Sequence, residues 1–215
     1  MLRLRPLDLG YEMASSKPDA CWRGIMGRGE TMYFHFGTRK IIEAVATLLR
    51  SDPCRRMGAL RLLKLLYIAD RESFREVGRP IVGTKPVAMD FGPIHSDVYD
   101  LVKGSHWDEE TWAEFIRKDG INVELTKDPG VLTLSRYEID KLTETAERYR
   151  DVSDYDLVGV THAFPEWSKN YRKKTSMPIP MSDILEAVGR ADEEDDILGD
   201  AKHVRAFNML FGMTS

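Results

Sequence analysis

The segment from Gly58 to Gly78 constrains the fold most, because its sequence, GALRLLKLLYIADRESFREVG, predicts one long amphipathic helix. At about 100° per residue, charged residues gather on one side and apolar residues on the other. The charged side comprises Arg61, Lys64, Arg71, Glu72, Arg75 and Glu76, interrupted by Leu65 and Ile68. The apolar arc comprises Leu60, Leu62, Leu63, Leu66, Tyr67, Ala69, Phe74 and Val77. We therefore expect this helix to pack its apolar arc into a core.

Asp70 lies in the middle of that apolar arc. A buried carboxylate without a partner costs several kcal/mol, so the helix needs a hydrogen-bond donor or a cation from elsewhere in the chain. The candidates are His162, the indole N–H of Trp167, the hydroxyl of Tyr99 and the backbone amides near Gly92. We favour His162 or Trp167, because an imidazole or indole at the end of another helix is a compact donor.

Composition and charge indicate a soluble globular protein: 215 residues, 42% hydrophobic, 31% charged, with a formal net charge of -4. That charge gives no overall attraction to nucleic acid or to an anionic membrane. The local basic patches are interpreted as solvated faces: Arg55, Arg56, Arg61 and Lys64, then Arg172, Lys173 and Lys174. Cys21 and Cys54 form no metal-binding or disulfide pattern, and no apolar run is long enough to span a bilayer. We expect a cytoplasmic protein without metal or cofactor.

We expect two parts in the chain: a weakly ordered N-terminal leader over residues 1–36 and a single helical domain over residues 37–215. Thr38 is a candidate N-cap of the first helix, and Pro53 separates this helix from the long one. Gly78 has the position of a left-handed C-cap for the long helix.

Short strands are predicted in two places. In PVAMDFGPIHSDVYDLVKG, Val87, Met89 and Phe91 alternate like a strand, Gly92-Pro93 predicts a turn, and a helix carrying Tyr99 follows. The segment from Trp107 to Ile116 predicts a helix capped by Asp108. INVELT (121–126) and VLTLS (131–135), joined by Lys127-Asp128-Pro129-Gly130, predict a β-hairpin.

Helix-start signals recur in the C-terminal third. Ser135 with Glu138 has the spacing of a capping box for a helix reaching about Arg150, and Ser153 with Asp156 repeats it for a helix ending near Phe164. Ser182 predicts another cap, and the acidic run 192–196 favours the start of a last helix. The total is about seven helices with a small antiparallel β-hairpin or sheet. The expected fold class is therefore mainly α (α+β), a compact bundle.

No motif predicts catalysis. The five histidines lack metal-ligand spacing, and nucleophile-elbow, phosphate-loop and dinucleotide-binding patterns are absent from the sequence. His162 and Glu166 have the spacing of an acid/base couple on a helix, but Pro165 interrupts that helix, so structural roles are favoured.

Two segments combine features of recognition surfaces. Phe91-Gly92-Pro93 projects an aromatic residue beside a helix start, and a tight connection is favoured over a recognition surface. Trp167 and Tyr171 precede the basic run 172–174 in a Pro-bounded loop whose composition suits protein contacts.

Three motifs resemble the Panacea domain, the SocA-like antitoxin domain of bacterial and phage toxin–antitoxin systems. They are KLLYIAD at 64–70, the stretch from Gly78-Arg79-Pro80 through MDFGPIHSDVYDLVKG, and THAFPEW at 161–167. They occur in the family's order, and the resemblance covers about residues 38–190. The candidate family and binding positions are Lys64, Tyr67, Asp70, Phe91, Gly92, Pro93, Tyr99, His162, Glu166 and Trp167.

The resemblance implies a helical, non-enzymatic protein that neutralises a cognate toxin by direct binding. Some relatives act as adaptors that deliver the toxin to an unfoldase-protease, some occur in prophages, and the family supplies no catalytic residue. Two other functions stay open from the residues: a hydrolase or transferase using Asp70, His162 and Glu166, and a DNA-binding regulator whose hairpin forms a wing. The net charge argues against nucleic acid as a partner, and no membrane partner is expected.

Overall fold

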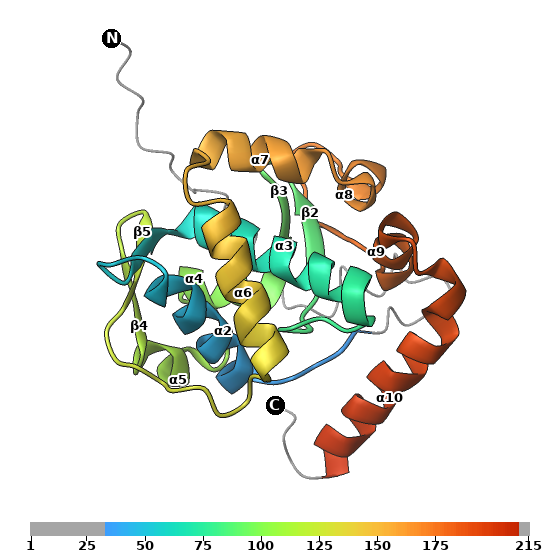
Figure 1. The fold of residues 1–215 in the computed structure, drawn as a ribbon, viewed down its shortest axis with the longest axis horizontal. Helices are drawn as coiled ribbons and strands as arrows, with labels where there is room; N and C mark the ends of the chain where they lie inside the picture. Colours follow the sequence, from blue (N-terminus) through green and yellow to red (C-terminus); the bar gives the residue numbers. More distant parts are fainter. Residues whose placement is uncertain (1–32, 211–215) are drawn as a thin grey trace. The chain divides into compact units, whose positions relative to one another are not determined.

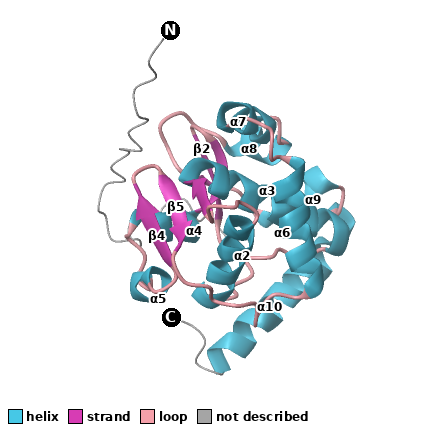
Figure 2. Cartoon of the chain, turned by 60° about the vertical axis from the view of Figure 1, so that its left-hand side comes forward, coloured by secondary structure: helices cyan, strands magenta, loops and turns pink. Residues whose placement is uncertain are grey.

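The structure is a computed structural model, and it describes residues 33–210. Within that range the chain forms nine α-helices and two three-stranded antiparallel sheets (Figures 1 and 2). The helices are α2 (Thr38–Arg50), α3 (Ala59–Val77), α4 (Ser96–Lys103), α5 (Glu109–Ala113), α6 (Arg136–Arg148), α7 (Asp154–His162), α8 (Pro165–Asn170), α9 (Met181–Val188) and α10 (Glu194–Leu210), with a 3-10 turn η1 (Ala191–Glu193) before α10. The expected class, mainly α with some β, is confirmed.

The strands form two separate sheets. They are β1 (Arg56–Gly58), β2 (Pro86–Met89), β3 (Gly92–His95), β4 (Ile116–Asp119), β5 (Asn122–Leu125) and β6 (Met177–Pro178). The first sheet has the order β1-β5-β4 and the second the order β3-β2-β6. In the second sheet, β6 comes from the C-terminal third of the chain and pairs Pro178 with Val87 of the β2–β3 hairpin.

Helix α3 is the central element, in contact with α2, α6, α7, α9 and strand β3 (Figure 1). Every residue from Leu62 to Asp70 is buried, including those on the side predicted to be polar. The reason is that neighbours surround this helix, so its periodicity marks only the most apolar of several buried faces. Gly78 ends the helix with a φ of 70° and donates its N–H to the Phe74 carbonyl, which confirms the predicted C-cap.

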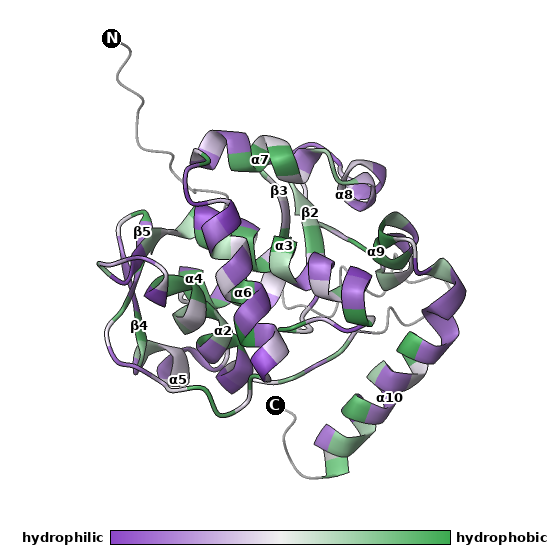
Figure 3. Ribbon diagram, in the orientation of Figure 1, coloured by the Kyte–Doolittle hydropathy of each residue, from purple (hydrophilic) through white to green (hydrophobic). Residues whose placement is uncertain are grey.

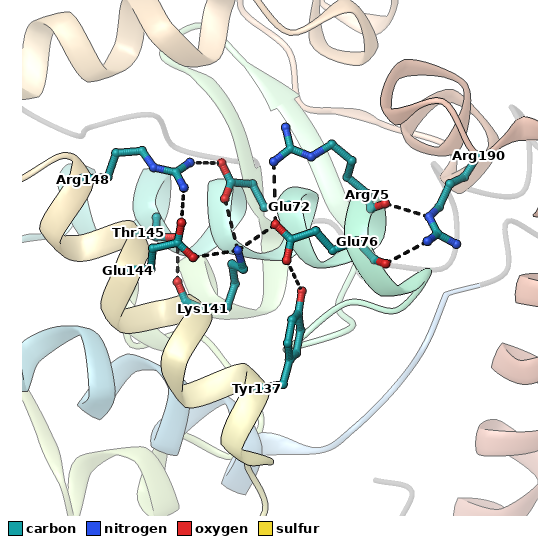
Figure 4. Close-up of polar contacts among 9 residues, drawn as sticks. All are labelled: Glu72, Arg75, Glu76, Tyr137, Lys141, Glu144, Thr145, Arg148 and Arg190. Atoms are coloured by element: carbon teal, nitrogen blue, oxygen red, sulfur yellow. Dashed lines mark hydrogen bonds and ion pairs between the residues drawn. The ribbon is translucent and has the colours of Figure 1, made fainter.

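Apolar and hydrophilic segments separate along the ribbon (Figure 3). Strand β2 and helix α9 are mainly apolar, and helix α6 is mainly hydrophilic. Helix α6 packs on α3 through a polar network centred on Lys141, which contacts Glu72, Glu76 and Glu144 (Figure 4). Arg148 of α6 pairs with Glu72 and Glu144 as well. This interface is therefore held by charge pairs beside its apolar contacts.

The predicted hairpin between residues 121–126 and 131–135 is wrong. Strand β5 pairs with β4, through a turn at Gly120-Ile121, and residues 131–135 form no strand. The carboxylate of Glu43 explains the difference, because its Oε2 accepts the N–H groups of Leu132 and Thr133 at 2.9 and 2.7 Å. Those donors then need no strand partner. The helix predicted from Trp107 to Ile116 is shorter, α5, because Ile116 begins β4.

The turn predicted at Gly92-Pro93 is also misplaced. Met89 pairs with Gly92, so the turn residues are Asp90 and Phe91, and Gly92-Pro93 begin strand β3. Pro93 is tolerated there because β3 is an edge strand of its sheet, where a missing N–H leaves no gap in the ladder.

Some of the predicted N-caps are formed and others are not. Ser135 and Glu138 form the predicted capping box. Ser153 accepts the N–H of Asp156, which confirms the helix start, but the Asp156 carboxylate accepts the Ser153 hydroxyl and does not complete a capping box. Helix α6 ends at Arg148 and α7 at His162, two residues before each expected end. Thr38 and Ser182 are not caps, because Gly37 and Pro180 hold the N-cap positions and the two residues lie inside their helices. The acidic run opens α10 as expected, through η1.

Most of the expected leader, residues 1–32, lies outside the described residues, as does Cys21. Its last four residues are described, and among them Phe34 is buried against Phe74 and Met181 in a core cluster. Cys54 is an exposed free thiol. No helix within residues 33–210 combines the length and apolar character needed to cross a membrane.

Candidate functional site

Asp70 is buried, with 2% of its surface exposed, as predicted. Its Oδ1 accepts the backbone N–H groups of Ile81 and Val82 at 2.8 and 3.0 Å, and its Oδ2 lies 3.3 Å from Nε2 of His95. The prediction that His162 or Trp167 is the partner of Asp70 is wrong. Neither the Tyr99 hydroxyl nor the amides near Gly92 donate to the Asp70 carboxylate. The chain turns back directly after Gly78, and this return places the amides of residues 81 and 82 over Asp70.

The environment of this pair shifts both pKa values toward the neutral forms. Burial raises the pKa of Asp70, although His95 and the backbone amides oppose the shift. Burial lowers the pKa of His95, although Asp70 opposes it, so His95 is neutral at pH 7. The pair is therefore a close buried contact between strand β3 and helix α3, and neither Oδ2 of Asp70 nor Nε2 of His95 has a hydrogen-bond partner among the described residues.

The cavity beside this pair is small. It is lined by Tyr67, Asp70, Thr84 and His95 among others, and its volume of about 20 Å³ suits a single water molecule. Ligand pockets usually measure about 300–1,000 Å³. This cavity can therefore hydrate the buried polar atoms around it but cannot admit a substrate.

Glu166 is held by helix α3 and is 1% exposed. Its Oε1 accepts the Nε–H of Arg71 at 2.7 Å and the hydroxyl of Tyr67 at 3.2 Å. Burial and the nearby Glu166 carboxylate raise the pKa of Tyr67. Pro165 is the first residue of α8 and His162 the last of α7, which confirms the predicted helix break. Glu166 thus pairs with Arg71, and its proposed coupling with His162 is not found.

Lys64 is fully buried, contrary to its predicted place on the polar side of the helix. Its Nζ donates to the carbonyl of Pro93 at 2.9 Å, and burial lowers its pKa well below the usual value. Gly92 lies next to it with a φ of 97°, and a Cβ there would lie 2.6 Å from Oγ1 of Thr161. Strand β3 therefore approaches α3 and α7 at a distance that only glycine permits.

An aromatic stack holds the other side of the hairpin. Trp167 stacks on His162, with ring centroids 4.0 Å apart, and on Tyr171, with centroids 4.7 Å apart. The indole Nε1–H of Trp167 donates to the carbonyl of Met89 at 3.0 Å. Burial and the ammonium of Lys64 lower the pKa of His162. Tyr99 is packed in the core, and Phe91 is 45% exposed at the turn.

The family motifs thus converge on the β2–β3 hairpin. The first motif supplies Lys64 and Asp70 from α3, and the last supplies His162 and Trp167 from α7 and α8. The hydrolase residues do not converge: Asp70 is bound by backbone amides, Glu166 is bound by Arg71, and His162 is stacked on Trp167. His95 and Arg71 are the residues that sequence reasoning missed. The sequence signal for His95 is its position two residues after Pro93, in the strand that the second motif contains.

The fold and site define a class of protein: a mainly helical domain whose motif residues hold a β-hairpin against a central helix. In residues 33–210, no three His, Cys, Asp or Glu side chains are grouped as metal ligands. Residues 62–168 match the family model of the antitoxin SocA-like Panacea domain. The chain belongs to this SocA-like antitoxin family, as the motifs indicated. No curated protein and no solved structure shows a significant match to the chain.

Proposed function

We propose that this protein is the antitoxin of a toxin–antitoxin system and neutralises its cognate toxin by direct binding in the cytoplasm. The family match supports the proposal. The single observation that carries it is that the motif residues are buried and bound within the chain itself. Asp70, Glu166 and Lys64 are each buried and bound to another part of the same chain. Residues used in this way stabilise a surface for a partner and are not available to a substrate.

The enzymatic alternative has no assembled site to support it. Asp70, His162 and Glu166 have separate partners, and the cavity at Asp70 has room for about one water molecule. A general acid or base must come within hydrogen-bonding reach of a bound substrate. Direct binding of a protein therefore fits the geometry better than hydrolysis or group transfer.

The DNA-binding alternative loses the hairpin from which it was predicted, although β4 and β5 form a hairpin of their own. The predicted wing between residues 121–126 and 131–135 is not formed, and the formal net charge of -4 gives no general attraction to phosphates. Binding of the toxin is the neutralising event in our proposal, and delivery to an unfoldase-protease would act after it.

Co-expression tests the proposal. Each reading frame beside the gene is expressed alone in bacteria to find a product that arrests growth, and then together with this protein. We expect rescue of growth and co-purification of the two proteins. Asp70→Ala, which removes the acceptor of two backbone amides, should weaken rescue in proportion to its loss of stability. If no neighbouring product arrests growth, or if rescue occurs without a complex, the proposal is wrong.

A further inference from the structure

Phe91 is an exposed apolar side chain at the tip of the β2–β3 hairpin. It is 45% exposed and is the second residue of the two-residue turn between Met89 and Gly92. Single exposed apolar residues are common on protein surfaces, so exposure alone carries no inference. Phe91 differs because the backbone that presents it is fixed on several sides.

The turn is held by side chains from α8 and the segment after it. The carboxylate of Asp90 accepts the hydroxyl of Tyr171 at 3.0 Å and the backbone N–H of Lys174 at 2.8 Å. The indole of Trp167 binds the carbonyl of Met89, and Gly92 is confined by Thr161 on the other side. A side chain on such a rigid turn loses little conformational freedom on binding, which is the condition for a strong contact residue.

The same contacts bring a basic segment beside Phe91. Arg172, Lys173 and Lys174 are all exposed, and the amide of Lys174 is bound to the residue that precedes Phe91. The guanidinium of Arg172 donates to backbone carbonyls, and no carboxylate in residues 33–210 forms an ion pair with the three cations. Lys169, by contrast, is paired with Asp183 and Glu186. Three cations without an ion-pair partner among the described residues therefore lie in the segment that is bound to the turn carrying Phe91.

We propose that Phe91 and the basic segment Arg172–Lys174 form the toxin-binding surface, and that they fit an acidic face of the toxin with an apolar recess for the Phe91 ring. The inference rests on the proposed function, because it names the part of the antitoxin that meets the toxin. Aromatic and arginine side chains carry much of the energy of protein interfaces, and complementary charge speeds association and selects the partner.

The aromatic residues favour a protein partner over a single-stranded nucleic acid. Bases bind by stacking on free aromatic faces. Trp167 is already stacked with two rings of its own chain, His162 and Tyr171. The stack therefore supports the turn, and Phe91 is the exposed aromatic residue of that turn.

Two variants with matched controls test the inference. The first is Phe91→Ala, with Ile121→Ala as control, because Ile121 is 59% exposed in the two-residue turn of the β4–β5 hairpin. The second is the triple charge reversal Arg172→Glu, Lys173→Glu and Lys174→Glu. Its control reverses Lys85, Lys118 and Lys202, three exposed lysines on other segments, so the change in net charge is equal.

The probe is the neighbouring gene product that arrests growth, and the readouts are rescue and binding to the purified protein. We expect Phe91→Ala to weaken binding about 10- to 100-fold and the basic triple variant to slow association about 10-fold at low salt. Both should keep the wild-type melting temperature, and both controls should bind as wild type.

Each outcome decides a different claim. If wild type rescues growth and both variants bind like their controls, the proposed function stands and the inferred surface is wrong. If wild type neither binds nor rescues, both claims are wrong. If the triple variant abolishes binding of a DNA or RNA oligonucleotide while rescue is unchanged, the surface binds nucleic acid and the inference is overturned.

Discussion

Asp70 and His95 face each other in the interior, with 3.3 Å between Oδ2 of the carboxylate and Nε2 of the imidazole. The other carboxylate oxygen of Asp70 binds the amides of Ile81 and Val82. One side chain on α3 therefore holds both the segment that leaves the helix and the strand that returns to it.

Replacing Asp70 by alanine should lower the free energy of unfolding by about 3–5 kcal/mol, because two backbone amides lose their acceptor inside the core and His95 loses the carboxylate beside it. Asp70→Asn keeps one acceptor oxygen and should lose less. Urea denaturation followed by circular dichroism measures both. A variant as stable as wild type would show that the carboxylate is not needed.

His95 should make the protein less stable as the pH falls below 7. Its folded pKa is lowered from 6.5, so the unfolded chain binds the proton first, and stability decreases as the pH falls through the unfolded value. His162, whose pKa is also lowered, acts in the same direction. The raised pKa of Asp70 acts in the opposite direction.

Thermal melts of wild type and His95→Gln between pH 7.5 and 5.5, a window of about one pH unit on either side of the ordinary histidine value, test this prediction. The variant should show a shallower loss of stability on acidification. Equal slopes for the two proteins would contradict the prediction.

Gly92→Ala should destabilise the protein more than Gly120→Ala, although both glycines have positive φ in or beside hairpin turns. A Cβ at Gly92 would lie 2.6 Å from Thr161 Oγ1, whereas a Cβ at Gly120 meets no atom within 4 Å. We expect a loss of about 1 kcal/mol at Gly120 from backbone strain alone, and at least about 2 kcal/mol at Gly92. Equal losses would mean that strand β3 can move away from α7.

The charge network between α3 and α6 should contribute to stability mainly through Lys141 (Figure 4). Lys141 is buried between Glu72 and Glu76, so Lys141→Ala should cost about 2 kcal/mol. The control is Arg136→Ala, because Arg136 pairs with Asp140 on the same helix with side chains 89% and 64% exposed. That pair should contribute less than about 0.5 kcal/mol. Chemical denaturation compares the two, and a smaller loss at Lys141 than at Arg136 would contradict the prediction.

Local signals in the sequence predicted local structure well. The Ser135–Glu138 capping box and the Gly78 C-cap are decided within one helical turn, so nearby residues suffice to predict them. The need of Asp70 for a partner was also predictable, because helical periodicity places it among apolar residues. The identity of that partner was not, because His95 reaches it only after the chain has turned back and formed the β2–β3 hairpin.

Long-range packing explains the errors at residues 131–135 and at Lys64. The alternation in residues 122–125 correctly predicts a strand, but β4 takes the place expected for residues 131–135, whose amides are bound by Glu43 instead. The helical angle of Lys64 predicts a position on the polar face of the helix. It is buried because β3 packs over that face and supplies a carbonyl for its ammonium group. Neither contact has a signature near the residue concerned.

The stoichiometry of neutralisation tests the central claim most directly. Purified toxin at fixed concentration is titrated with this protein, and the remaining toxin activity is measured together with complex formation in the same samples. An antitoxin that acts by binding should remove activity in proportion to the amount added, with an end point at a fixed molar ratio that equals the composition of the complex. Loss of activity at amounts far below the toxin concentration, increasing with time, would contradict the account, because only a catalyst inactivates many partner molecules in turn.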